Sequence, residues 1–225
     1  ASSALNITVD TAAPAAPSVS AITDDTGTAS DGITSDSQLI ITGTAEANAS
    51  VEVFIDAGSI GTTTADGSGN WSFDHTGTTL SDGSYAITAA ATDASGNTSA
   101  ASSALNITVD TAAPVAPAVT TITDDTGTAS DGITSDNQLI ITGTAEANAS
   151  VEVFIDAGSI GTTTADGSGN WSFDHTSTTL ADGSYAITAA ATDVSGNTSA
   201  ASSALNITVD TAAPAAPSVS AITDD

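Results

Sequence analysis

Apolar and polar residues alternate in short runs throughout the chain, which predicts β-strands rather than helices. In each hundred residues we expect seven strands, whose apolar positions begin at Val19 and Leu39 and then lie in 51–55, 60–65, 71–73, 85–91 and 105–109. Clusters of Asp, Gly, Ser and Asn separate these runs at 56–58, 66–70, 82–83 and 93–97. Seven short strands in about 100 residues are typical of an immunoglobulin-like β-sandwich.

The chain repeats itself with a period of 100 residues. Residues 1–100 and 101–200 align without a gap and differ at eight positions, and 201–225 repeat 1–25 letter for letter. Solenoid repeats are only about 20–45 residues long, so each repeat is expected to be one sandwich domain. The predicted fold is therefore all-β, with tandem immunoglobulin-like β-sandwich domains arranged end to end.

Prolines set the expected domain boundaries. Pro14 and Pro17, like Pro114 and Pro117, bracket an Ala-rich stretch that stiffens a linker and prevents strand pairing. The predicted parts are 1–13 as the last strand of a preceding repeat with its linker, 14–112 and 113–212 as two domains, and 213–225 as the first strand of a following repeat.

Charge and composition exclude several classes of function. The chain has 27 Asp and Glu, no Lys, no Arg and no Cys, and its formal net charge is −27. Without cationic side chains it lacks contacts for phosphodiester backbones and anionic lipids, so we expect no nucleic-acid partner. Without Cys it has no disulfide, zinc–thiolate site or thiol nucleophile. No apolar run approaches the roughly 18 residues of a membrane span, so we expect no direct membrane insertion.

Catalysis is not expected either. His75 directly follows Asp74, and neighbours on a strand point to opposite faces, so the two cannot form an acid–imidazole relay. Each repeat has one His and no thiol or activated-serine motif. Trp71 and Phe73 share one strand face, which favours core packing over a sugar-stacking platform.

Four segments resemble a known family. The segments ITGTAEAN (41–48), ADGSGNWSF (65–73), LSDGSY (80–85) and ATDASGN (91–97) resemble the bacterial Ig-like extender repeats of giant type I-secreted RTX adhesins. They are also similar to the repetitive region of a marine ice-binding adhesin of that class. The resemblance implies calcium-rigidified stalk repeats outside the cell, on a bacterial surface. The RTX nonapeptide itself is absent from this chain.

An odd number of strands brings the chain into each domain at one pole and out at the other. The last strand of one domain then delivers an Asp to the entry loops of the next. In the second domain these loops lie around Glu146 and Asn148, at 166–170 and at 193–197, and in the first domain around Glu46 and Asn48, at 66–70 and at 93–97. Converging carboxylates repel one another, and with no Lys or Arg present we expect a bound cation. Ca²⁺ suits such oxygen ligands. The predicted ligand sets are Asp10, Glu46 and Asp93 at the first junction, and Asp110, Glu146 and Asp193 at the second.

The loop over 24–36 carries a second acidic cluster at the exit pole, where Asp82 is also expected. The residues predicted to hold at least one cation there are Asp24, Asp25, Asp31 and Asp36, with their copies Asp124, Asp125, Asp131 and Asp136. The alternative is a polar loop whose Asp side chains cap their own backbone in Asx turns. Likewise, 66–70 and 93–97 are better interpreted as turns when taken alone, and the pole geometry with the family resemblance favours Asp93 as a ligand.

These observations predict a calcium-rigidified spacer that holds a distal binding domain away from the cell. We expect a monomeric rod whose partners are neighbouring repeats of the same chain. Extracellular calcium modules bind at about 10⁻⁴ to 10⁻³ M, so the sites would fill outside the cell. The alternative is an adhesion module whose loops bind carbohydrate or a host surface, because multivalent binding also uses repeats.

Overall fold

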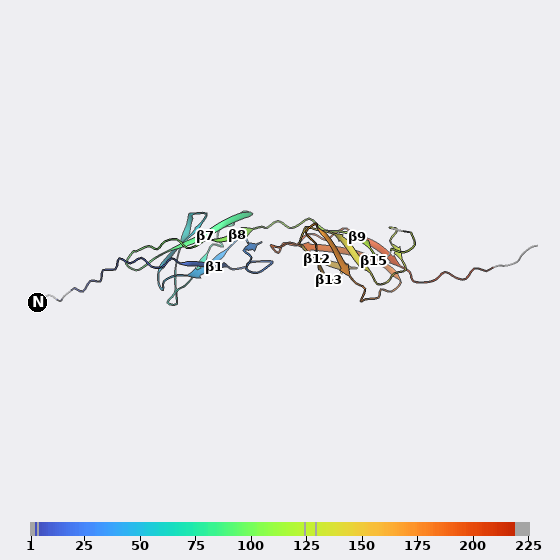
Figure 1. The fold of residues 1–225 in the computed structure, drawn as a ribbon, viewed down its shortest axis with the longest axis horizontal. Helices are drawn as coiled ribbons and strands as arrows, with labels where there is room; N and C mark the ends of the chain where they lie inside the picture. The colour runs from blue at the N-terminus through green and yellow to red at the C-terminus, as the bar shows by residue number, and fades with distance from the viewer. Residues whose placement is uncertain (1–2, 4, 124, 129, 219–225) are drawn as a thin grey trace, which may run out of the picture. The chain divides into compact units, whose positions relative to one another are not determined.

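A computed structural model describes residues 3, 5–123, 125–128 and 130–218. The chain forms two compact units, Ala1–Ala113 with Val194–Asn197, and Pro114–Asp193 with Thr198–Asp225. The described residues of both units form strands, turns and irregular segments (Figure 1). Among them there is no helix long and apolar enough to cross a membrane.

The two units contain corresponding strands. Those of the first unit are β1 (Ser18–Ile22), β2 (Ile33–Thr34), β3 (Ile40–Thr44), β4 (Ser50–Ile55), β5 (Gly58–Thr64), β6 (Asn70–Asp74), β7 (Gly83–Thr92) and β8 (Leu105–Val109). Those of the second are β9 (Ala118–Ile122), β10 (Ile133–Thr134), β11 (Ile140–Thr144), β12 (Ser150–Ile155), β13 (Gly158–Thr164), β14 (Asn170–Asp174), β15 (Gly183–Thr192) and β16 (Leu205–Val209).

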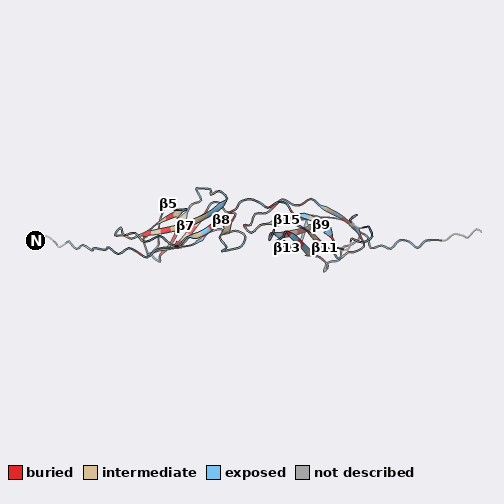
Figure 2. Ribbon diagram, turned by 45° about the horizontal axis from the view of Figure 1, so that its top comes forward, coloured by how far each residue is buried: buried red, intermediate tan, exposed pale blue. Residues whose placement is uncertain are grey.

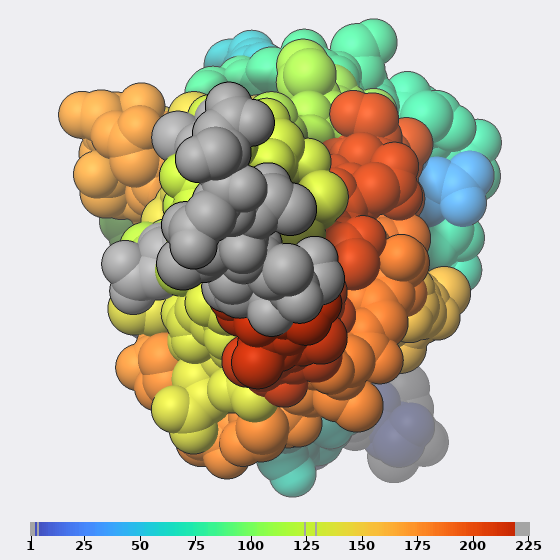
Figure 3. Space-filling model, turned by 90° about the vertical axis from the view of Figure 1, so that its right-hand side faces the viewer, coloured from blue at the N-terminus to red at the C-terminus, as the bar shows by residue number. Residues whose placement is uncertain are grey.

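Each unit has a three-stranded and a five-stranded sheet. In the first unit the orders are β1-β3-β6 and β2-β8-β7-β4-β5. In the second they are β9-β11-β14 and β10-β16-β15-β12-β13. The strands β15 and β16 pair, and in Figure 3 the red segment that contains β16 adjoins the orange segment that contains β15. Paired strands are antiparallel except β2 with β8 and β10 with β16. The predicted all-β sandwich class is confirmed.

The core follows the predicted alternation. Val51 and Val53 are fully buried, whereas Glu52 and Phe54 on the opposite face of β4 are half-buried. Figure 2 colours the strands of both units by burial, with buried segments in red. Trp71 is 3% exposed and packs in the core cluster of the first unit, so its predicted structural role is confirmed. Burial of each large aliphatic side chain stabilises the fold by about 1.5–3 kcal/mol.

A tyrosine fixes the corner before the longest strand of each unit. The Tyr85 hydroxyl donates to the main-chain oxygen of Ser81 at 2.7 Å, and Tyr185 donates to that of Ala181 at 2.9 Å. The segment 80–85 therefore forms a tyrosine corner. Because the acceptor is a backbone oxygen, Ser and Ala at this position serve equally well.

The structure adds a strand that the sequence analysis did not predict. Among the residues that the structure describes, the first unit has eight strands rather than seven, and the additional one is β2. Two residues are too few to show a period in the sequence. Their strand conformation depends on pairing with Thr108 and Val109, which lie more than 70 residues further along the chain.

The domain boundaries stay a prediction. Three apolar residues near the start of the chain lie in the part predicted as the last strand of a preceding repeat. Leu5, Ile7 and Val9 are exposed and, among the described residues, have no strand partner. Their sequence equals that of β8, where Ile107 and Val109 are buried. Residues 219–225, which include most of the strand predicted within 213–225, lie outside the described part.

Gly43 offers a sharp test of the packing between β1, β3 and the tryptophan. A Cβ there would lie 2.0 Å from the Ser18 carbonyl oxygen and 2.4 Å from Trp71 Cζ2. We expect Gly43→Ala to lower the free energy of unfolding by about 1–3 kcal/mol, because neither neighbour can retreat without disturbing the core. Denaturant unfolding of the full chain measures this.

The matched control is Gly77→Ala, because a Cβ at Gly77 meets nothing within 4 Å and the second repeat already carries Ser177 there. Equal unfolding midpoints for the two variants would contradict the packing described here.

Candidate functional site

The loops predicted at the entry pole share backbone hydrogen bonds. The N–H of Ala45 donates to Gly69 at 2.8 Å, and that of Asn48 donates to Asp66 at 3.3 Å. The loops 45–48 and 66–70 therefore lie side by side, as strand counting predicts. In the loop 66–70, the Asp66 carboxylate accepts backbone N–H groups of its own turn.

The linker before the first domain is held at this pole by the turn 93–97. Asn97 Nδ2 donates to Asp93 Oδ2 at 2.8 Å and to the main-chain oxygen of Asp10 at 3.2 Å. The Ser95 hydroxyl lies 3.5 Å from Asp10 Oδ2. Asp93 Oδ1 in turn accepts the backbone N–H groups of Ser95 and Asn97. Asp10 and Asp93 are thus connected through an amide that binds both.

The same contacts recur one repeat later, within the first compact unit. Asn197 Nδ2 donates to the main-chain oxygen of Asp110 at 2.8 Å, and the Ser195 hydroxyl donates to Asp110 Oδ2 at 3.2 Å. The recurrence shows that linker contact is a property of the repeat. Asp93, which the sequence predicted as a site residue, fixes the turn. The side chains that contact the linker are instead those of Ser95 and Asn97. Their only signal in the sequence is the Asp-x-Ser-x-Asn spacing.

Hydrogen-bond donors lower the pKa of two turn carboxyls. The side-chain amide of Asn97, followed by its backbone N–H, lowers the pKa of Asp93 below 3.8. The backbone N–H of Asn70, followed by that of Ser68, lowers the pKa of Asp66 below the same value. In both cases the donors favour the ionised form.

The predicted ligand set at the first junction does not form an acid cluster. Glu46 is exposed, and its main-chain oxygen accepts the Ala49 N–H at 3.1 Å. Within the described ranges no three His, Cys, Asp or Glu side chains are grouped so that they could hold a metal ion. Calcium binding by Asp10, Glu46 and Asp93, and by Asp110, Glu146 and Asp193, stays a prediction.

Several acids of the exit loop cap their own backbone. Asp31 Oδ1 accepts the Ile33 N–H at 2.8 Å, and Asp36 Oδ1 accepts the Gln38 N–H at 2.8 Å. The copies Asp131 and Asp136 make the same bonds. These are the Asx turns of the alternative interpretation. The position of Asp124 lies outside the described residues.

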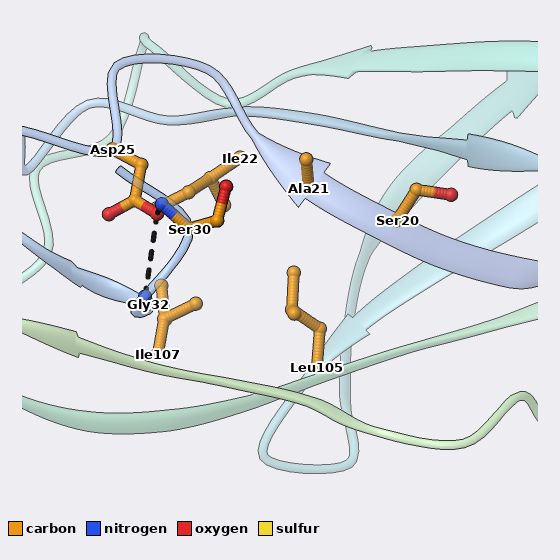
Figure 4. A pocket seen from close by; sticks show the side chains of 8 residues that line it. All are labelled: Ser20, Ala21, Ile22, Asp25, Ser30, Gly32, Leu105 and Ile107. Atoms are coloured by element: carbon orange, nitrogen blue, oxygen red, sulfur yellow. Dashed lines mark hydrogen bonds between the residues drawn. The ribbon is translucent and has the colours of Figure 1, made fainter. Parts of the chain in front are cut away.

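Asp25 is the exception in this loop. Its Oδ2 accepts the N–H groups of Ser30 at 2.7 Å and Gly32 at 3.4 Å (Figure 4). Its Oδ1 is buried and has no hydrogen-bond partner among the described residues, and the same holds for Asp125 Oδ1. Asp25 lines a pocket of about 120 Å³ with apolar residues that include Ile22 and Ile107. A buried carboxylate oxygen without a donor fits a cation or a water molecule.

The chain leaves the first domain beside Asp82, as strand counting predicts. Asp82 Oδ1 accepts the backbone N–H of Thr111 at 3.0 Å and its hydroxyl at 2.8 Å. The N–H of Asp110 donates to the Thr34 oxygen at 2.9 Å. The exit segment is thus held at the pole opposite the turn 93–97.

The family model for the bacterial Ig-like domain matches residues 12–111 and 113–211. The chain therefore belongs to the bacterial Ig-like domain family and carries two copies of the domain. No curated protein matches the chain.

Similar solved structures include modular bacterial proteins. The fibronectin(III)-like modules of Clostridium thermocellum CbhA are 18% identical, with 84% of this chain and 94% of theirs covered and a TM-score of 0.47. A structure from a 1.5-MDa bacterial ice-binding adhesin is 24% identical, with 88% and 66% covered and a TM-score of 0.45. A tetra-tandem repeat from the extending region of a large adhesion protein is 22% identical, with 89% and 50% covered and a TM-score of 0.35. These superpositions are loose, so nothing about function follows from them.

The pKa of Asp93 predicts how acid acts on the first domain. A carboxyl whose pKa is lower in the folded state stabilises the fold above its unfolded-state pKa, and this contribution disappears as the pH falls through the folded pKa. We therefore expect the melting temperature to fall when the pH is lowered below about 4, and to fall less in Asp93→Asn than in the parent chain. Melting curves in high salt, which screens general repulsion, measure this.

Glu52→Gln is the control for the loss of one carboxylate, because Glu52 accepts only the Ser59 hydroxyl among the bonds seen here. If Asp93→Asn and Glu52→Gln lose stability with acid in parallel with the parent chain, the Asp93 turn does not contribute in this way.

Proposed function

We propose that these domains are structural extender repeats of a bacterial surface adhesin and act outside the cell as a spacer. The observation that carries this proposal is the fixation of the chain at both poles of the first domain. Asn97 holds the incoming segment at Asp10, and Asp82 holds the outgoing segment at Thr111. A segment held at each end transmits orientation from one repeat to the next better than a free linker.

Three further features support a spacer. The chain consists of two bacterial Ig-like domains whose sequences differ at eight positions, and near-identical copies suit a role that depends on number and length. The sequence has no Cys and one His in each repeat, so it offers no thiol nucleophile. The four segments that resemble adhesin extender repeats point to the bacterial surface.

Calcium is part of this proposal. The acids have no cationic side chain to neutralise them anywhere in the sequence. Among the described residues the fit to an ion is best at Asp25, whose buried Oδ1 has no donor. We propose that Ca²⁺ binds Asp25 and the carboxylates predicted at the junctions, and that it stiffens the array by binding only the folded state.

Linker fixation has a direct test. The double variant Asn97→Ala and Asn197→Ala removes the amide that contacts each linker, so the distribution of distances between fluorophores on the two repeats should broaden. The control is Asn6→Ala, because Asn6 is exposed and outside both contacts. Identical distributions for the parent chain and the double variant would overturn the role given to these turns.

Calcium binding has a separate test. With a dissociation constant of about 10⁻⁴ to 10⁻³ M, 10 mM Ca²⁺ should stabilise each domain by about 1.4–2.7 kcal/mol relative to excess chelator. Asp25→Asn should reduce this gain in the first domain, whereas Asp74→Asn should not, because Asp74 is exposed at the end of β6. Equal melting temperatures in Ca²⁺ and chelator would refute the calcium part and leave the spacer proposal standing.

A further inference from the structure

The first and last parts of each domain are joined directly by a parallel strand pair. β2 lies near the start of the domain and β8 is its last strand, yet Ile33 pairs with Thr108 and Thr34 with Val109. The second unit repeats this pairing between β10 and β16. The other strand pairs within each unit are antiparallel, so this contact differs in kind from the rest.

Hydrogen bonds flank the pair on both sides. The N–H of Thr108 donates to Gly32 at 2.7 Å, and that of Asp110 donates to Thr34 at 2.9 Å. The second unit has the corresponding bonds from Thr208 to Gly132 at 2.7 Å and from Asp210 to Thr134 at 2.9 Å. We call the segments 32–34 and 108–110, with their equivalents 132–134 and 208–210, the parallel clamp.

A buried hydroxyl holds β2 in place. Thr34 is fully buried, its Oγ1 donates to the main-chain oxygen of Asp24 at 2.7 Å, and it accepts the N–H of Asp36 at 3.0 Å. A strand of two residues could not persist on its own pairing, because short strands gain little from the ladder. The Thr34 hydroxyl ties it to the loop on either side.

The direction of the strands decides how tension acts on the clamp. Tension along the chain pulls the start of a domain toward its N-terminal side and the end of β8 toward its C-terminal side. Since β2 and β8 run parallel, these pulls slide one strand along the other. In a parallel pair the hydrogen bonds are evenly spaced and slant across the gap between the strands, so sliding loads them together, whereas peeling would load them one at a time.

We propose that the parallel clamp is the mechanical lock of each domain, the contact that must break before the domain extends under tension. The backbone hydrogen bonds from Thr108 to Gly32 and from Asp110 to Thr34, together with the Thr34 hydroxyl, then set the rate of forced unfolding. The biological meaning of this lock rests on the proposed spacer role, but its geometry lies within each domain and does not depend on calcium or on the linker.

Single-molecule stretching of the full chain tests the proposal. The chain has no Cys, so a cysteine added at each end gives unique attachment points. In the double variant Thr34→Val and Thr134→Val the side chain keeps its shape but loses the hydroxyl. We expect unfolding at constant tension to become roughly five- to tenfold faster, the change that corresponds to one lost hydrogen bond.

The matched control removes a hydroxyl away from the clamp, from the half-buried Ser102 and its buried copy Ser202. In Ser102→Ala and Ser202→Ala the lost hydroxyls are those that accept the N–H of Ala89 and Ala189 at 3.0 Å. This variant should lose comparable stability in denaturant without a comparable rise in the rate under tension. Equal rises in the two variants, or none in the threonine variant, would overturn the proposal.

Two more variants keep the test decisive if the valine variant does not fold. Thr34→Ser with Thr134→Ser retains the hydroxyls and should unfold under tension at nearly the parent rate. Ile33→Gly with Ile133→Gly weakens β2 through a strand position that is 52% exposed in the second unit, so the core is little affected. It should speed unfolding under tension, and an unchanged rate would count against the clamp. The spacer proposal is read from fluorophore distances, so the two can fail independently.

Discussion

The absence of any cationic side chain governs the polar structure of this protein. With no Lys or Arg, an ordered carboxylate can be satisfied only by N–H groups, hydroxyls, amides, water or ions. Asp66 and Asp93 accept backbone N–H groups of their own turns, and Asp82 accepts both donors of Thr111. The same donors also make the linker contacts, because the Ser95 hydroxyl and the Asn97 amide of the turn 93–97 reach Asp10. Asp25 Oδ1 is the contrast, because it is buried and has no hydrogen-bond partner among the described residues.

The differences between the repeats show which positions the fold depends on. The eight differing positions avoid the buried aliphatic core: Ala15/Val115, Ser18/Ala118, Ser20/Thr120, Ala21/Thr121, Ser37/Asn137, Gly77/Ser177, Ser81/Ala181 and Ala94/Val194. Val115 and Val194 are 84% and 46% exposed. The core side chains are identical in both copies, and so are Asp93, Ser95 and Asn97 and their equivalents in the turn 193–197. Packing density explains this, since a core changed by one methylene is already perturbed, whereas the outer positions have room to vary.

Much of the fold could be predicted because it depends on local pattern. Val51 and Val53 alternate with Glu52 and Phe54, so period two gave both the strand and its buried face. Tyr85 and its corner carry a local signal as well. The candidate sites were harder. Counting strands placed the loops 45–48, 66–70 and 93–97 at one pole, but it could not reveal that the side-chain amide of Asn97 donates to both Asp93 and Asp10. Side-chain hydrogen bonds of this kind depend on positions resolved to about an ångström.

The sequence by itself determined the all-β class, the repeat, the core faces and the lack of basic or thiol chemistry, because each of these is a property of composition or of spacing along the chain. Only the tertiary structure decided that Ile33 and Thr34 form a strand, since their partners Thr108 and Val109 are brought beside them by the closing of the sandwich. It also decided which carboxylate oxygen lacks a donor. Both are consequences of contacts between residues distant in sequence, where no local preference of the backbone specifies the outcome.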